Sequence, residues 1–98
     1  MGKYEKLLDK WKNHVPPQAP KEEVFNLARH FGLLIETPKR GSHYLLRDIR
    51  LTEYNLTRKS QDIFDDCFTI PVSGGKYIKN RYIKRLVDFI EFITEESS

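Results

Sequence analysis

The sequence predicts an α+β fold: a two-layer sandwich in which two helices cover one face of a three-stranded antiparallel sheet, with an additional helix at the N-terminus. Three observations predict it. Three stretches repeat apolar residues with the period of a helix. The middle of the chain contains short apolar runs separated by turn residues, which is typical of hairpin-connected strands. The length of 98 residues matches a single domain.

Two apolar stripes with the spacing i, i+3, i+4, i+7 predict the first two helices. Their members are Tyr4, Leu7, Leu8 and Trp11 in the first helix, and Val24, Leu27, Ala28 and Phe31 in the second. The proline-rich segment 15–20 cannot continue a helix, because proline lacks an amide donor and restricts the residue before it. Pro20 suits the first position of the second helix, and Gly32 suits its end. We therefore expect residues 1–20 to form a helix and linker, and residues 21–98 to form the domain itself.

Residues 78–93 predict a third helix with one apolar and one basic face. The apolar stripe contains Ile83, Leu86, Val87 and Ile90, and the other face carries Arg81, Lys84, Arg85 and Asp88. Residues 76–85 contain five basic side chains and no acidic one. Such a patch attracts polyanions over roughly a Debye length, about 8 Å at physiological salt. A solvated helix face is the alternative interpretation.

The middle of the chain predicts strands. Residues 33–37 and 43–51 are apolar runs on either side of a turn at 38–42, which together predict a hairpin. Phe68, Ile70 and Val72 alternate in a third strand, and Pro71 there favours a sheet edge. The polar segment 52–66 is expected to be a long connection that in part extends the second and third strands.

Composition excludes several classes of protein. Hydrophobic residues make up 39% and charged residues 32%, which is typical of a globular protein and not of a disordered one. No apolar run approaches the roughly 20 residues of a membrane span, and the N-terminus lacks the features of a secretory signal. The single Cys67 cannot form an internal disulfide, and no Cys/His cluster has metal-ligand spacing. We expect a cytoplasmic protein with no membrane partner, metal or cofactor.

The tripeptide Gly41-Ser42-His43 sets a titratable ring directly after a tight turn. Gly41 allows the backbone to turn and approach a phosphate, and Ser42 can donate its hydroxyl to a phosphate or cap the turn. From residue chemistry alone, the more common role of such a histidine is structural, as a strand residue that hydrogen-bonds the turn.

Several short motifs follow one another between about residues 21 and 93: Glu23-Val24, Leu27, Phe31-Gly32-Leu33, Arg40-Gly41-Ser42-His43-Tyr44, Ile70-Pro71-Val72, and Gly75-Lys76 followed by Lys79 and a long helix. In order and spacing they resemble the HicA toxin family. The resemblance implies a fold like that of the double-stranded-RNA-binding domain, mRNA interferase (endoribonuclease) activity and a neutralising HicB-like antitoxin as partner. The N-terminal helix and segment 52–66 depart from the compact family pattern.

RNA cleavage by its own 2′-hydroxyl requires a base, an acid and cations that stabilise the negative charge of the phosphorane. Histidine suits the proton transfers because its ring titrates near neutral pH, and we expect His43 to be the catalytic residue. The residues expected to bind RNA are Arg40, Gly41, Ser42, Arg47, Lys76 and Lys79. One histidine cannot be base and acid at once, so Tyr44, Lys76 or water must supply the second group.

Two other functions are compatible with the sequence. The first is a noncatalytic module that binds RNA or a protein on the same fold. The second is a purely protein-binding domain that docks through the first helix and Trp11. RNA cleavage, RNA binding without cleavage, and absence of RNA affinity distinguish the three.

Overall fold

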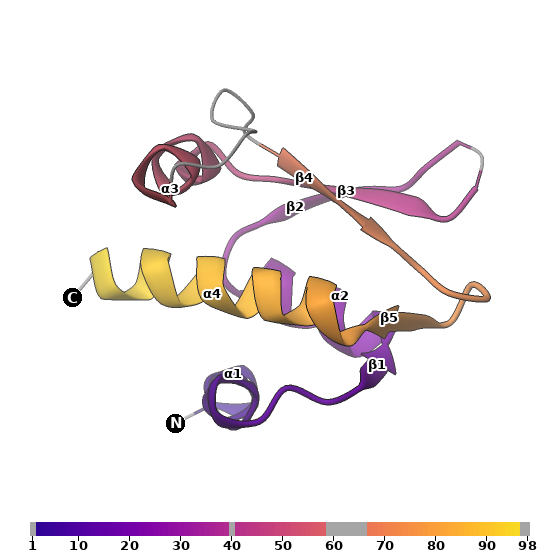
Figure 1. Cartoon of the computed structure of the whole chain (residues 1–98), viewed down its shortest axis with the longest axis horizontal. Helices are drawn as coiled ribbons and strands as arrows, with labels where there is room; N and C mark the ends of the chain where they lie inside the picture. Colours follow the sequence, from indigo (N-terminus) through magenta and orange to yellow (C-terminus); the bar gives the residue numbers. More distant parts are fainter. Residues whose placement is uncertain (1, 40, 59–66, 97–98) are drawn as a thin grey trace.

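The chain forms a three-stranded antiparallel sheet with a layer of helices beneath it (Figure 1). The computed structural model describes residues 2–39, 41–58 and 67–96. In chain order the elements are α1 (Lys3–Asn13), β1 (Gln18–Pro20), α2 (Lys21–His30), β2 (Leu34–Glu36), β3 (His43–Arg47), α3 (Arg50–Arg58), β4 (Cys67–Pro71), β5 (Tyr77–Lys79) and α4 (Asn80–Glu96). The predicted α+β class and the three-stranded antiparallel sheet are confirmed.

The strand order of the main sheet is β2-β3-β4, so β3 is central and β4 is an edge strand. The predicted hairpin is the β2–β3 pair, with Ile35 opposite Leu46. Strand β4 pairs along all of β3, from His43 opposite Pro71 to Arg47 opposite Cys67. Pro71 therefore lies on an edge strand, as expected for a residue without an amide donor.

The two faces of this sheet differ. Leu46, Phe68 and Ile70 are buried, and they lie on the face covered by α2 and α4 (Figure 1). Because side chains alternate along a strand, His43 and Arg47 lie on the opposite face. None of the described elements covers that face. On this face His43 and Thr69 are exposed, whereas Leu45 and Arg47 are half-buried.

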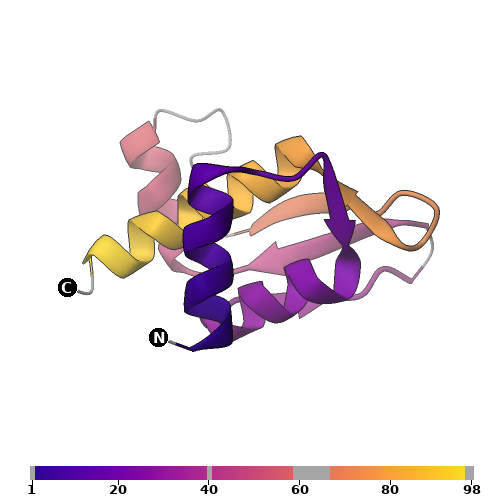
Figure 2. The same cartoon turned by 90° about the horizontal axis from the view of Figure 1, so that it is seen from below.

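Helix α1 packs on the side of the helical layer that is turned away from the sheet (Figures 1 and 2). Its Leu8 and Trp11 belong to the same buried cluster as the apolar residues of α2 and α4. His30 of α2 also contacts the Glu5 carboxylate of α1. With 2% of its surface exposed, Trp11 contributes to the core and is not available as a docking residue. The division of the chain at residue 20 stays a prediction.

The expectation for residues 48–58 was wrong, because the predicted strand ends at Arg47 and helix α3 follows at Arg50. Asp48 starts the helix: its carboxylate accepts the backbone amide hydrogen of Arg50 at 2.9 Å, an Asx turn. Leu51 and Tyr54 are buried, and the Tyr54 ring lies 5.4 Å from that of Phe89 in α4. Residues 59–66 of the expected connection lie outside the described residues.

The proline-rich linker forms a second, two-stranded sheet that was not predicted. Strand β1 pairs antiparallel with β5, and the buried pair Ala19 and Ile78 lies at its centre. Pro20 is the N-cap of α2 instead of its first residue, and α4 begins at Asn80 instead of residue 78. The amide of Asn80 donates to the carbonyl of Pro17 at 2.9 Å, which fixes the linker against the start of α4.

Within the described ranges, no helix combines the length and the apolar character that crossing a membrane requires.

Candidate nucleic-acid interface

The Gly41-Ser42-His43 turn is fixed at the beginning of β3. Gly41 has a φ of +81°, a left-handed conformation that glycine adopts without strain. The carbonyl of Ser42 accepts the amide hydrogen of Val72 at 2.8 Å, which extends the β3–β4 ladder by one step. His43 follows, opposite Pro71. The tripeptide is thus held by backbone hydrogen bonds, while Arg40 lies outside the described residues.

The His43 side chain is exposed on the uncovered face of the sheet. The described part of the chain gives its imidazole no hydrogen bond or ion pair. The structural role considered for this histidine, a hydrogen bond to the turn, is therefore not seen among these residues. A ring held at a strand end without such a partner can exchange protons with a bound ligand.

Tyr44, one of the groups considered as the second acid or base, lies on the face opposite to His43. Its ring centroid is 4.9 Å from that of Phe25 in α2. Its hydroxyl lies 3.5 Å from the ammonium of Lys21. Because neighbouring strand residues point to opposite faces, Tyr44 and His43 do not face each other. Lys76 and water remain as the second group.

Lys76 lies in the turn that joins β4 to β5. Gly74 and Gly75 take φ values of 58° and 71° there, and the amide of Lys76 donates to the Ser73 carbonyl at 3.1 Å. This turn begins directly after Val72, the hydrogen-bond partner of Ser42. The turn that precedes His43 and the turn that holds Lys76 therefore lie at the same end of the molecule (Figure 1).

Lys79 ends β5 next to the first residue of α4, and its side chain is exposed. Lys79 and Tyr77 lie on the solvent side of the small sheet, because Ile78 between them is buried. The expected position of Lys79, near the amino end of the last helix, is confirmed.

Arg47 lies at the other end of β3 from His43. Arg47 is four positions further along the chain, which is about 13 Å along a strand. The Nε atom of Arg47 is 3.2 Å from Oε1 of Glu36 on β2. The structure therefore does not bring Arg47 to the His43 turn, although both residues lie on the same face.

Beyond Arg47, an ion pair connects β3, α2 and α3. Nε of Arg50 donates to Oδ1 of Asp48 at 2.8 Å, and Nη2 of Arg50 donates to the carbonyl of Phe31 at 3.0 Å. Burial by itself raises the pKa of Asp48, but the hydrogen bonds and charge of Arg50 outweigh it and hold that pKa below its usual range. Asp48 in turn raises the pKa of Arg50. At this end of β3, Arg47 and Arg50 therefore each form an ion pair with a carboxylate.

Lys21 was not identified from the sequence. Its backbone amide donates to the carbonyl of Lys76 at 2.9 Å, and its ammonium lies over the Tyr44 ring, 5.7 Å from the centroid. A lysine as first residue of a helix opposes the helix dipole, which disfavours cations at the N-terminus. This unfavourable placement is the feature of the sequence that could have pointed to Lys21.

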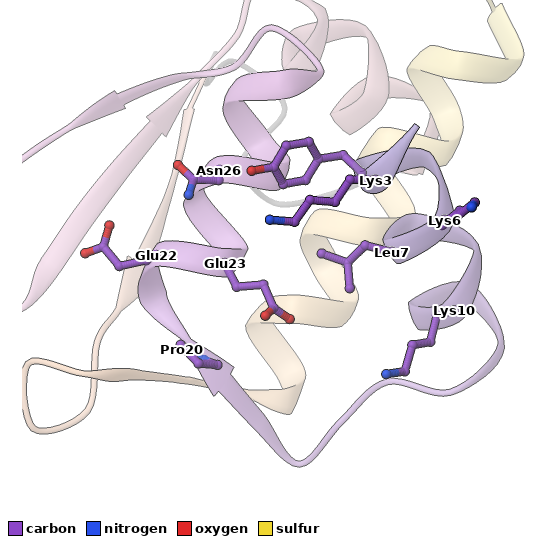
Figure 3. Close-up of a pocket in the computed structure, with 9 residues that line it drawn as sticks. Lys3, Lys6, Leu7, Lys10, Pro20, Glu22, Glu23 and Asn26 are labelled. Atoms are coloured by element: carbon purple, nitrogen blue, oxygen red, sulfur yellow. The ribbon is translucent and has the colours of Figure 1, made fainter. Parts of the chain in front are cut away.

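A separate groove lies between α1 and α2, and its volume is about 510 Å³ (Figure 3). Lysines of α1 line one side, and Glu22 and Glu23 of α2 line the other. The lysines are Lys3, Lys6 and Lys10. Among the described residues, none of those expected to bind RNA lines this groove.

Among the residues that the structure describes, no group of three or more His, Cys, Asp or Glu side chains has the arrangement of a metal site. Comparisons with protein-family models, with curated proteins and with solved structures find no match for this chain. The candidate site is an exposed histidine and exposed lysines at one end of a small α+β domain.

Proposed function

We propose that the protein is a toxin-like mRNA interferase that cleaves RNA with His43 as general acid or base. One observation carries the proposal: the exposed His43 ring has no partner among the described residues and begins a strand fixed beside the lysine-bearing turn. The motifs shared with the HicA family support it. They also support a fold of the double-stranded-RNA-binding type and a HicB-like antitoxin as inhibitor, and the single Cys67 is consistent with the proposed cytoplasmic location.

The proposed reaction is attack of a 2′-hydroxyl on the adjacent phosphodiester. The new bond joins the 2′-oxygen to phosphorus, and the bond from phosphorus to the 5′-oxygen of the next nucleotide breaks. The products are a 2′,3′-cyclic phosphate and a 5′-hydroxyl. His43 transfers one of the two protons, and Lys76 or water transfers the other. A lysine ammonium beside the phosphate stabilises the negative charge that develops in the transition state.

The test is cleavage of a labelled RNA by the parent protein and by the variants His43→Ala and His43→Gln. General acid–base catalysis is worth roughly 10²- to 10⁴-fold, so the rate is expected to fall by about that factor. His14→Gln is the matched control, because His14 is exposed next to α1 and outside the site. Circular dichroism checks that the variants fold. Cleavage by folded His43→Ala at the parent rate would remove His43 from the mechanism.

A noncatalytic RNA-binding module is the second candidate function. The orientation of Tyr44 favours it, because this neighbour of His43 faces Phe25 and Lys21 and not the imidazole. A salt-dependent gel shift in which the RNA stays intact would support binding without cleavage. The appearance of 5′-hydroxyl fragments that depend on His43 would exclude this alternative.

A further inference from the structure

The backbones of two lysines meet where the β1–β5 sheet joins α2. The register of this pair places Pro20 opposite Tyr77, and the next step joins Lys21 to Lys76 through a backbone hydrogen bond of 2.9 Å. Lys21 also lies at the positive end of the α2 dipole. The fold thus brings the backbones of two basic residues together at the start of α2.

Among the residues that the structure describes, neither ammonium forms an ion pair with a carboxylate, although Glu22 and Glu23 follow Lys21 in the first turn of α2. The partner of the Lys21 ammonium is the hydroxyl of Tyr44. Lys12 differs, because its ammonium lies 3.3 Å from Glu91. An anion from outside the protein can supply the compensation that the fold lacks.

We propose that Lys21 and Lys76 bind one phosphate group of the RNA and that Tyr44 is a positioning residue for Lys21. This inference rests on the proposed RNA substrate. The packing of Tyr44 against Phe25 fixes its hydroxyl, which accepts a hydrogen bond from Lys21 and keeps its own proton for a phosphate oxygen.

The position of the site defines the path of the RNA. Tyr44 and His43 are adjacent in β3 but lie on opposite faces of the sheet. An RNA chain that contacts both the lysine pair and His43 therefore passes around the end of the sheet at which β3 begins (Figure 1). The lysine pair holds the chain on one face while the phosphodiester to be cleaved lies on the other.

The test measures binding of a fluorescent single-stranded 2′-O-methyl RNA by anisotropy, because this RNA lacks the attacking hydroxyl and stays intact. Lys21→Gln is expected to weaken binding about fivefold at 0.1 M salt and to reduce the salt slope by about 0.7, the value for one phosphate contact with a single strand. Lys21→Arg keeps the charge and is expected to bind within about twofold of the parent.

Lys10→Gln is the matched control, because it removes the same charge from an exposed position on α1. An equal loss of affinity in Lys10→Gln and Lys21→Gln would show a general charge effect and overturn the site. Parent affinity in folded Lys21→Gln would overturn it as well.

Tyr44→Phe tests the positioning role. It keeps the ring that packs on Phe25 and removes the hydroxyl beside Lys21. The affinity is expected to fall about two- to threefold, as for loss of a weak hydrogen bond, while the salt slope stays unchanged because no charge is lost. A changed slope with unchanged affinity would contradict this role.

Two further measurements separate this inference from the proposed function. Parent protein that binds the 2′-O-methyl RNA through Lys21 but leaves ordinary RNA intact would refute the nuclease and support the phosphate site. If Lys21→Gln cleaves ordinary RNA at the parent rate and binds the 2′-O-methyl RNA with the parent affinity, the nuclease is supported and the phosphate site is refuted. Inorganic phosphate, titrated at constant ionic strength, identifies the source of the anion: saturable binding of phosphate without RNA affinity would overturn RNA as the ligand.

Discussion

The basic residues near the two ends of strand β3 differ in whether they form ion pairs with carboxylates. At the Arg47 end, Arg47 pairs with Glu36, and Arg50 pairs with Asp48 and the carbonyl of Phe31. At the His43 end, Lys21 and Lys76 are joined through their backbones, and within the described ranges neither of them nor the His43 ring forms an ion pair with a carboxylate. Both ends contain basic residues, but among the described residues only the Arg47 end pairs them with carboxylates.

This difference separates structural cations from candidate ligand-binding cations. A guanidinium held by a carboxylate and a carbonyl has its hydrogen-bonding capacity partly used, and its removal affects folding. An ammonium without an acidic partner contributes little to stability and is available to an anion. The comparison predicts that substitutions at the two ends will affect different measurements.

The largest expected effect is on stability at the Arg47 end. Asp48→Ala removes the Asx turn that starts α3 and the carboxylate that holds Arg50, and it should lower the free energy of unfolding by about 3 kcal/mol. Urea denaturation measures this value. Glu36→Ala, which removes the exposed partner of Arg47, is the control and should cost at most about 1 kcal/mol. Equal effects of the two variants would contradict a special role for Asp48.

The second prediction concerns pH. The pKa of Asp48 is lower in the folded protein than its ordinary value, so its contribution to stability is present above pH of about 4 and is lost as the pH falls through the folded-state pKa. The stability difference between the parent and Asp48→Asn should therefore shrink between pH 5 and 2. Glu5, whose pKa is lowered by its hydrogen bond with His30, titrates with the same sign but is common to both proteins. A difference that grows on acidification would contradict the assignment.

The smallest expected effect compares two single-charge changes in RNA binding. Lys76→Gln should weaken binding of the 2′-O-methyl RNA about fivefold at 0.1 M salt, because an uncompensated ammonium is lost from the proposed phosphate site. Arg47→Gln should weaken RNA binding less than about twofold, since Arg47 already forms an ion pair with Glu36. The reverse order would show that the RNA lies along the uncovered face toward Arg47, as the sequence-based assignment of Arg47 implies.

The sequence predicted the parts of this fold that follow from local periodicity and glycine chemistry. The stripes of α1, α2 and α4, the β2–β3 hairpin and the left-handed Gly32 and Gly41 all follow from residues close together in the chain. Helix α3 was missed because Leu51 and Tyr54 are apolar at a spacing of three residues within a polar segment, and a single pair does not distinguish a helix from a strand end.

The missed features of the candidate site depend on contacts between distant segments. His43, Lys76 and Lys79 were singled out from short motifs, whereas Lys21 comes next to Lys76 only when β1 pairs with β5. Three residues of strand that end in proline carry almost no β signal, and their pairing is stabilised by burial of Ala19 and Ile78 against the helices. Neither the pairing nor the position of Tyr44 relative to Lys21 follows from local sequence.

The β1–β5 pair also determines when Lys21 and Lys76 can come together during synthesis. It joins the linker after the first helix to the strand that precedes the last helix. Such contacts between sequence-distant segments form late, because closing a long loop costs entropy before the contacts repay it. On a ribosome, Lys21 and Lys76 cannot form their backbone contact until Lys76 has emerged. The apolar faces of α1 and α2 are not buried until α4 has also emerged. A nascent chain therefore lacks the contact between the two lysine backbones until residues 76–79 have left the ribosome.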